Sequence, residues 1–278
     1  MYKSNYHSHC VFCDGRSPME DFVKTAISLG LKKYGFSSHG PIPFETQWTM
    51  KEENFPYYQL EFSRLKEKYK NEIDLYIGLE VDFIPGYSSV ENEFYRDKSF
   101  DYLIGSVHYI DKIADEKYMG IDGAFTDFEK GLNLIYGGDI QAISKRYYEI
   151  LKMMIEIGGF DIVGHLDKIS YHGTKYPDFD IRSKWYEQLM GETLQLIKDK
   201  GIIVEINTKS LLERGITFPH QHFYPLMNEL KIPITVNSDC HYIDKITEGF
   251  DLTFTFLKKA GFNSVQQLTE GKWQAVEF

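Results

Sequence analysis

The chain of 278 residues contains little cysteine, no excess of positive charge and no long apolar run. Its three cysteines, an odd number, do not indicate the disulfide framework of a small secreted protein. The formal net charge of −10 argues against a nucleic-acid-binding surface, which is usually basic. No apolar run approaches the ~18 residues of a membrane span, and no charged-then-apolar leader follows Met1. We therefore expect a cytoplasmic protein that binds neither nucleic acid nor membranes.

The composition is that of a globular protein with a sizeable core, since 42% of the residues are hydrophobic and 26% are charged. The length suits one large α/β barrel or two ordinary domains. Seven short runs rich in Ile, Val, Leu and Tyr are typical of buried parallel strands. They lie at residues 4–9, 34–39, 75–83, 102–109, 162–166, 202–207 and 234–239.

Helical patterns separate most of these runs. Ser17-Pro18-Met19-Glu20 has the sequence of a capping box, and the helix that it begins is predicted to end at Gly30. This alternation predicts a parallel sheet with helical crossovers. Two long connections, 85–100 and 110–139, have the length of lids or binding loops. The other predicted helices include residues of 55–69, 147–155, 185–197 and 223–230.

Metal-ligand side chains gather at the ends of the predicted strands. His7 and His9 end the first run, and Asp239 and His241 follow the last one. Positions i and i+2 of an extended strand face the same side, so each pair points two ligands in one direction. In parallel barrels, functional groups gather at the carboxyl ends of the strands. The remaining ligand-type residues at or after such ends are Asp14, His39, Glu80, His108 and His165.

These nine residues exceed the four ligands of one tetrahedral zinc site, so we expect two or three metal ions. Mixed imidazole and carboxylate ligands suit Zn, Mn or Fe. Cys10-Val11-Phe12-Cys13 matches a redox pattern but lacks the helix that should follow it. We instead expect Cys10 and Cys240 to alternate with the ligands and to point away from the site.

The motifs around these ligands resemble those of the PHP (polymerase and histidinol phosphatase) superfamily along nearly the whole chain. Within the superfamily, the chain is most similar to histidinol-phosphatases of the PHP type. The segment after His39 is the most discriminating, although Gly40 stands where others of this type carry Ala. The motifs are His7-x-His9, Asp14-Gly15, Ser38-His39, Gly78-Leu79-Glu80, Gly105-Ser106-Val107-His108, Gly164-His165 and Asp239-Cys240-His241.

The resemblance implies a distorted (β/α)7 barrel, a single domain over residues 1–278, with three divalent metal ions. It assigns the ligands in three sets, with Glu80 shared by two of them. The sets are His7, His9, Glu80 and Asp239 for the first metal, Glu80, His108 and His165 for the second, and Asp14, His39 and His241 for the third.

The implied reaction is hydrolysis of L-histidinol phosphate to L-histidinol and phosphate, a step of histidine biosynthesis. A hydroxide between the first two metals, held through Glu80 and Asp239, is expected to attack phosphorus. No Cys-x5-Arg loop, Asp-x-Asp pair or phosphate-binding Gly-Lys-Ser/Thr loop is present in the sequence. A metal-activated nucleophile is therefore favoured over a protein nucleophile.

Cationic side chains in the loops on the same predicted face are candidates for binding phosphate. Arg16, Lys175 and Arg214 follow strands one, five and six. His172 and His220 are alternative candidates for phosphate contact or for protonating the leaving alkoxide. Each of these residues has the alternative of an ordinary solvated or packed side chain.

The leaving group in this reaction carries an amine and an imidazole, so its pocket should offer carboxylates and aromatic faces. Glu45 and Trp48, in the loop after strand two, are the candidates, although Trp48 could equally pack in the core. Asp167, two residues after His165, is a candidate partner for that imidazole.

Three other functions are consistent with parts of the pattern. Another PHP phosphoesterase, such as a nucleotide phosphatase or an exonuclease, would use the same metals, but the acidic charge disfavours binding to DNA. Metal-dependent amidohydrolases also begin with His-x-His, but usually have eight strands and a bridging group later in the chain than Glu80. A metal-binding or sensing protein without catalysis is the non-enzyme alternative.

Overall fold

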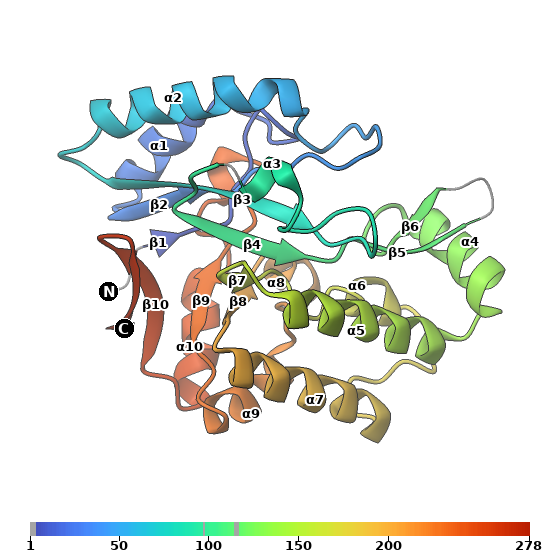
Figure 1. Ribbon diagram of the computed structural model, residues 1–278. Coiled ribbons are helices and arrows are strands. Elements are labelled where there is room, and N and C mark those ends of the chain that lie inside the picture. Colours follow the sequence, from blue (N-terminus) through green and yellow to red (C-terminus); the bar gives the residue numbers. More distant parts are fainter. Residues whose placement is uncertain (1–3, 97, 114–116) are drawn as a thin grey trace.

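The structure, a computed structural model, describes residues 4–96, 98–113 and 117–278 and contains a nearly closed barrel of seven parallel strands (Figure 1). Their order in the sheet follows their order along the chain. A parallel bridge between Ser8 and Cys240 brings the two edges together. The predicted (β/α)7 barrel is confirmed. The strands are β1 (Ser4–Asn5), β2 (Lys33–Phe36), β3 (Asp74–Asp82), β4 (Tyr102–Ser106), β7 (Ile162–Val163), β8 (Ile203–Asn207) and β9 (Ile234–Asn237).

The barrel strands are buried on both faces, which is why their sequences are nearly continuous apolar runs. Every residue of β8 and β9 is buried, and in β3 only Asp74 is exposed. Parallel strands need a covering layer on the outside and a filled interior. All seven strands overlap the predicted runs, and β2 and β3 begin one residue before them.

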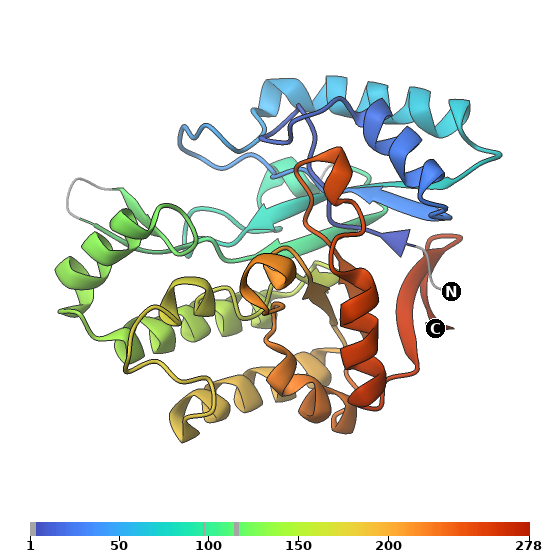
Figure 2. The ribbon, with the colours of Figure 1, turned by 180° about the vertical axis from the view of Figure 1, so that it is seen from behind.

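Helices cover the outside of the barrel (Figures 1 and 2). One pair, α1 and α2, lies together over β2 and β3, and a second pair, α5 and α7, lies side by side over β7 and β8. The helices are α1 (Met19–Ser28), α2 (Phe55–Lys68), α5 (Ile140–Ile157), α7 (Lys184–Lys200), α9 (Tyr224–Glu229) and α10 (Phe250–Lys259). Shorter helical segments are η1 (Glu52–Asn54), α3 (Glu93–Arg96), α6 (Ser170–Gly173), α8 (Leu211–Arg214), η2 (Gln221–Phe223) and η3 (Ile243–Lys245). In the part of the chain that the structure describes, no helix has both the length and the apolar character needed to span a membrane.

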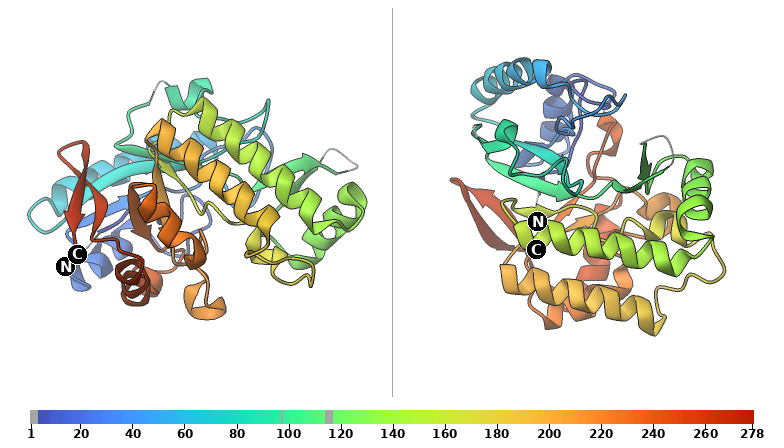
Figure 3. Two further views of the ribbon diagram at one scale, coloured as in Figure 1. Left: turned by 90° about the horizontal axis from the view of Figure 1, so that it is seen from below. Right: turned by 45° about the vertical axis from the view of Figure 1, so that its right-hand side comes forward.

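One end of the barrel is closed by the hairpin of β10 (Ser264–Thr269) and β11 (Lys272–Glu277) (Figure 3). The Leu268 N–H donates to Tyr6 Oη at 2.9 Å, and the Tyr76 hydroxyl donates to the Leu268 carbonyl at 2.8 Å. Trp273 packs edge-on against Tyr6 at 5.1 Å between ring centroids. The predicted elements stop at β9, and α10 and this polar hairpin were missed.

The opposite end, where the strands have their carboxyl ends, is flanked by the connection after β4. This connection was predicted as a long loop. The structure instead places in it β5 (Tyr109–Lys112), β6 (Tyr118–Gly120) and α4 (Phe125–Tyr136). The three elements project to one side of the barrel mouth (Figure 1). The described residues of β5, β6 and α4 therefore form a wall on one side of this mouth.

The predicted capping box of the first helix is wrong. Helix α1 begins at Met19 with Pro18 at the N-cap, and no side-chain cap hydrogen bond forms. The Glu20 carboxylate instead accepts hydrogen bonds from Arg64 and Lys68 of α2 at 2.7 and 2.6 Å. A carboxylate with two cationic partners in reach gains more from them than from a backbone N–H at the start of its own helix.

Candidate metal centre

The Glu80 carboxylate, buried at the end of β3, meets imidazoles from four other strand ends. Its Oε2 lies 3.1 Å from His7 Nε2 and 2.9 Å from His39 Nδ1. Its Oε1 lies 2.8 Å from His165 Nε2 and 3.5 Å from His108 Nε2. One side chain thus links five strands at the carboxyl end of the barrel.

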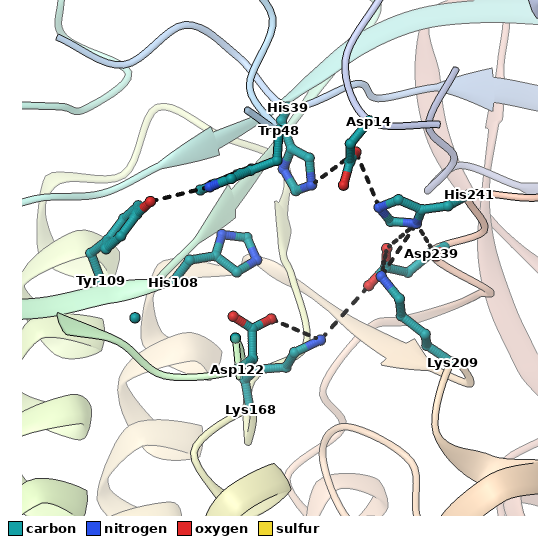
Figure 4. Close-up of a pocket in the computed structure, with 12 residues that line it drawn as sticks. Asp14, His39, Trp48, His108, Tyr109, Asp122, Lys168, Lys209, Asp239 and His241 are labelled. Carbon is teal, nitrogen blue, oxygen red and sulfur yellow. Dashed lines mark hydrogen bonds and ion pairs between the residues drawn. The ribbon is translucent and has the colours of Figure 1, made fainter. Parts of the chain in front are cut away.

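The carboxylates of Asp239 and Asp14 lie beside this cluster, toward the last strand (Figure 4). Asp239 Oδ1 lies 3.2 Å from His9 Nε2. Asp14 Oδ1 lies 3.3 Å from His241 Nε2 and 3.8 Å from His39 Nε2. Residues from both ends of the chain therefore meet at one place, because the barrel closes between its first and last strands.

These side chains form groups suited to holding metal ions. In each group the ligand atoms all lie within 4.8 Å of one another. His165 approaches Glu80 but belongs to none of the groups. The groups are His7, His9 and Asp239; His39, Glu80 and His108; and His9, Asp14, His39 and His241.

The donor atoms at this centre fit metal ions because several of them are buried with no hydrogen-bond partner among the described residues. Buried polar atoms are almost always satisfied in folded proteins, so a group of orphans at one place indicates a missing ligand. His165 and Asp239 also adopt positive φ, of 25° and 50°, which non-glycine residues hold only when surrounding structure forces it. The orphaned atoms are His7 Nε2, His9 Nε2, Asp14 Oδ1, His39 Nδ1 and Glu80 Oε2.

Two further carboxylates orient the imidazoles from behind. Glu205 Oε1, on β8, lies 2.6 Å from His7 Nδ1, and its Oε2 accepts the His165 backbone N–H at 2.8 Å. Asp82 Oδ1 lies 2.7 Å from His108 Nδ1. Such partners fix the ring orientation and leave the other nitrogen for a metal. Neither residue was predicted from the sequence, although a carboxylate inside a buried strand is a signal of such a partner.

The electrostatics of the centre follow from this packing. Burial alone would lower the pKa of His7, but the carboxylates of Glu205 and Glu80 hold that pKa well above its usual value. The pKa of His9 lies well below its usual value because of burial and of two neighbouring imidazoles, His241 and His39. A neutral imidazole is the form that binds a metal ion.

An open pocket lies beside the centre, at the barrel mouth (Figure 4). Trp48 and Tyr109 form an aromatic wall, with Trp48 Nε1 donating to Tyr109 Oη at 3.2 Å. Asp122, Lys168 and Lys209 bring charged groups to the same space. None of these three was predicted, since the loops that carry them have no ligand-type spacing.

Comparison with known proteins identifies the family. A model of the PHP domain matches residues 5–209. The chain belongs to the PHP domain family. A histidinol-phosphatase of Lactococcus lactis is 29% identical over 274 residues, which cover 95% of this chain and 94% of that protein. A histidinol-phosphatase of Bacillus subtilis is 25% identical over 269 residues, covering 90% and 98%.

Two solved structures share the fold of this PHP domain. A candidate histidinol phosphatase from Listeria monocytogenes superposes with a TM-score of 0.79 at 26% identity, over 90% of this chain and 99% of that one. A histidinol phosphate phosphatase from Lactococcus lactis superposes with a TM-score of 0.73 at 22% identity, over 98% of both chains. The Lactococcus lactis protein was solved in complex with zinc, L-histidinol and phosphate.

The three cations that the sequence suggested for binding phosphate lie at or beyond the edge of the pocket in this PHP domain. Arg16 is exposed in a neighbouring hollow that it shares with Asp14 and His241. The Arg214 guanidinium lies 3.6 Å from the centre of the Tyr171 ring and donates to the Tyr171 carbonyl at 2.8 Å. Lys175 lies over the Phe125 ring at 4.0 Å. The pocket lining includes none of these three cations.

Of the other residues predicted to contact the substrate, some line the pocket and others lie outside it. Trp48 lines the pocket, whereas Glu45 is exposed and lines a separate hollow in its own loop. His172 Nε2 lies 2.8 Å from the carbonyl of Gly123, a residue of the pocket wall. Burial lowers the pKa of His220 to about 4, so this imidazole is uncharged at neutral pH. It lies outside the pocket lining and caps η2 by accepting the His222 N–H at 3.0 Å.

Asp167 is not the partner of His165 in the PHP domain. Its carboxylate accepts hydrogen bonds from the Tyr186 and Tyr148 hydroxyls and from the His220 N–H. Burial raises the pKa of Asp167 to about 7. The side chain turns outward toward α5 and α7, because His165 leaves β7 with positive φ and reverses the alternation that predicted a contact.

The cysteines of the PHP domain do not have the surroundings of redox-active cysteines. Cys10 and Cys240 are buried in the core between the barrel and helices α1 and α2, pointing away from the ligands as expected. All three cysteines are free thiols. Burial raises the pKa of Cys10 to about 12 and that of Cys13 to about 11, so neither is a reactive thiolate.

Proposed function

We propose that this protein is a metal-dependent phosphate monoester hydrolase that converts L-histidinol phosphate to L-histidinol and phosphate. The observation that carries the proposal is the buried Glu80 carboxylate, which meets five imidazoles beside an open pocket. The curated relatives that match along most of the chain are histidinol-phosphatases, which supports this substrate over nucleotides or DNA ends. We further propose that residues 1–278 form a single domain and that the protein is cytoplasmic.

The proposed ligand sets are those that the resemblance implies, and the clusters of donor atoms match them in part: His39 also groups with Glu80 and His108, and His165 lies outside the groups. His7, His9, Glu80 and Asp239 would hold one divalent ion, and Glu80 would be shared with a second ion at His108 and His165. Asp14, His39 and His241 would hold a third. Zinc is the first metal to test, because the Lactococcus lactis protein of the same fold binds it, with manganese and iron as alternatives.

When bound, such ions would activate a water molecule and neutralise phosphoryl oxygens. The chain supplies the positioning. Glu205 and Asp82 fix the rings of His7 and His108, so that their other nitrogens face the Glu80 carboxylate before the substrate arrives. Trp48 and Tyr109 offer aromatic faces to the imidazole of the leaving group and exclude water from one side. Phosphoryl transfer depends mainly on such positioning and on charge stabilisation.

An amidohydrolase is disfavoured by the fold. The described barrel has seven strands, and Glu80, the carboxylate that two ions would share, lies on the third of them. A binding protein without catalysis would not need an open, aromatic-walled pocket beside its metal ligands.

Release of phosphate from a panel of monoesters tests the proposal directly. We expect L-histidinol phosphate to be hydrolysed with a kcat/KM of about 10⁴ M⁻¹s⁻¹ or more, well above nucleoside monophosphates and 4-nitrophenyl phosphate. Zn, Mn and Fe should be supplied separately to metal-free protein. Phosphate release from nucleotides but not from L-histidinol phosphate would contradict the assigned substrate and favour another PHP phosphoesterase.

Glu205→Gln tests the orientation of His7 from behind. The amide cannot hold the His7 ring as the carboxylate does, so we expect about a 10–100-fold loss of metal affinity or activity. Competition with a chromophoric chelator measures the affinity. Glu192→Gln, the same change at an exposed ion pair on α7, is the matched control. Equal affinity in the two variants would show that Glu205 does not act on the metal site.

A further inference from the structure

Lys168 is a buried cation that faces the pocket. Its side chain is 5% exposed, and its Nζ lies 3.4 Å from Asp122 Oδ2 and 4.0 Å from Asp239 Oδ2. Burying an ammonium group is costly unless anions surround it, and lysine is rarely buried for that reason. The Lys168 Nζ also lies 5.1 Å from the centre of the Phe218 ring, and the side chain lines the pocket beside the metal ligands, where an anionic ligand can reach it.

Asp122 is the other half of this ion pair and comes from the wall of the pocket. It lies between β6 and α4, and its neighbours Gly120 and Gly123 also line the pocket. The Gly123 carbonyl is fixed by the buried His172 ring. Figure 4 shows Asp122 and Lys168 together across the pocket from His39 and Asp14. Asp122 therefore presents a carboxylate to the pocket from an anchored segment.

The charges near Asp122 keep it ionised. Burial alone would raise its pKa, but Lys168, with smaller contributions from His108, His165 and Lys209, lowers the pKa to about 2. Two lysines are thus among the cations near Asp122. One is Lys168, and the other is Lys209, which lies on the far side of Asp239 with its Nζ 3.0 Å from Asp239 Oδ1. An anionic ligand that binds Lys168 would compete with Asp122 for it.

We infer that Lys168 and Asp122 form a two-part recognition site for a phosphate monoester that carries an amine on the carbon next to the ester carbon. The Lys168 ammonium binds a phosphoryl oxygen in place of Asp122, and the released carboxylate binds the ammonium of the same substrate. The exchange keeps every buried charge paired before and after binding. The inference rests on the proposed function and names the residues that select an amino-alcohol phosphate over an ester that lacks the amine.

The two products, titrated separately into zinc-loaded protein, test the two halves independently of turnover. Asp122→Asn should weaken binding of L-histidinol about 10–100-fold, by the loss of one charge-assisted hydrogen bond. It should not weaken binding of inorganic phosphate, because the carboxylate that competes for Lys168 is gone. Lys168→Met should do the reverse. Lys152→Met is the matched control, since Lys152 pairs with Glu192 on the outside of the barrel.

Steady-state turnover is a second test of the separate roles of Asp122 and Lys168. Asp122→Asn should lower kcat/KM about 10–100-fold for L-histidinol phosphate and much less for 4-nitrophenyl phosphate, whereas Lys168→Met should lower both. Zinc content and thermal unfolding must match the wild type, and Lys168→Gln replaces the Met variant if the latter does not fold.

Equal losses of histidinol and phosphate binding in Asp122→Asn would overturn the inference and leave Asp122 as a positioning residue for Lys168. Unchanged phosphate binding in Lys168→Met would overturn it as well. A third outcome separates the two proposals. If the variants lose binding of the two products as predicted, but the wild-type protein hydrolyses neither ester, the proposed function is overturned instead.

Discussion

Glu80→Gln should lower the rate of phosphate release by at least about 10³-fold, because one carboxylate serves two proposed metal ions. The amide that replaces it keeps the shape but loses the charge that balances the neighbouring imidazoles, which approach to 2.8–3.5 Å. His9→Asn should have a comparable effect, since its Nε2 lies 3.2 Å from Asp239 Oδ1 and has no hydrogen-bond partner among the described residues. Initial rates with L-histidinol phosphate in metal-defined buffer measure both variants.

The fold of these variants should persist because the barrel is held by its apolar core rather than by the ligands. Tyr6, Tyr76 and Tyr102 fill the interior below the site, and helices cover the outside. Far-UV circular dichroism and zinc content are the accompanying measurements. Glu192→Gln, an identical chemical change on the surface of α7, should retain full activity. A folded Glu80→Gln protein with near wild-type turnover would refute the assignment of the centre.

Removal of the metal ions should abolish hydrolysis and return of zinc should restore it. Without ions, His7 Nε2, His9 Nε2 and Glu80 Oε2 have no hydrogen-bond partner among the described residues, and their desolvation is uncompensated. Ions bind the folded state far better than the unfolded one, so we expect the melting temperature to rise by about 5–15 °C on saturation. Scanning calorimetry of chelator-treated and reconstituted protein measures the shift.

The control for this experiment is magnesium, a hard ion that prefers oxygen ligands and water. A centre with six imidazoles should discriminate against it, so magnesium should neither restore the rate nor raise the melting temperature as zinc does. Full turnover in protein shown by elemental analysis to be metal-free would contradict the proposed mechanism. A melting temperature that does not respond to zinc would contradict the proposed sites.

The barrel and the positions of the ligand-type residues could be predicted from the sequence because both follow local rules. Alternation along an extended segment puts His7 and His9 on one face. Asp239 and His241 follow the end of β9, where Asp239 has positive φ, so closure of the barrel brings them to the centre. Parallel order then brings the carboxyl ends of the strands together, as the contacts of Glu80 show. The hairpin of β10 and β11 was missed because its strands are polar and half exposed, with no apolar run to mark them.

The sequence by itself determined the kind of chemistry, through imidazoles and carboxylates that recur at the ends of apolar runs. Only the tertiary structure decided which charged groups face the pocket. Arg214 and Lys175 lie against aromatic rings outside the pocket lining, whereas Lys168, which also lies over the Phe218 ring, meets Asp122 in the pocket beside the ligands. The reason is physical: a strand fixes the direction of its side chains by a period of two, but a loop has no period. The direction of a loop residue is set by the distant elements that pack against it.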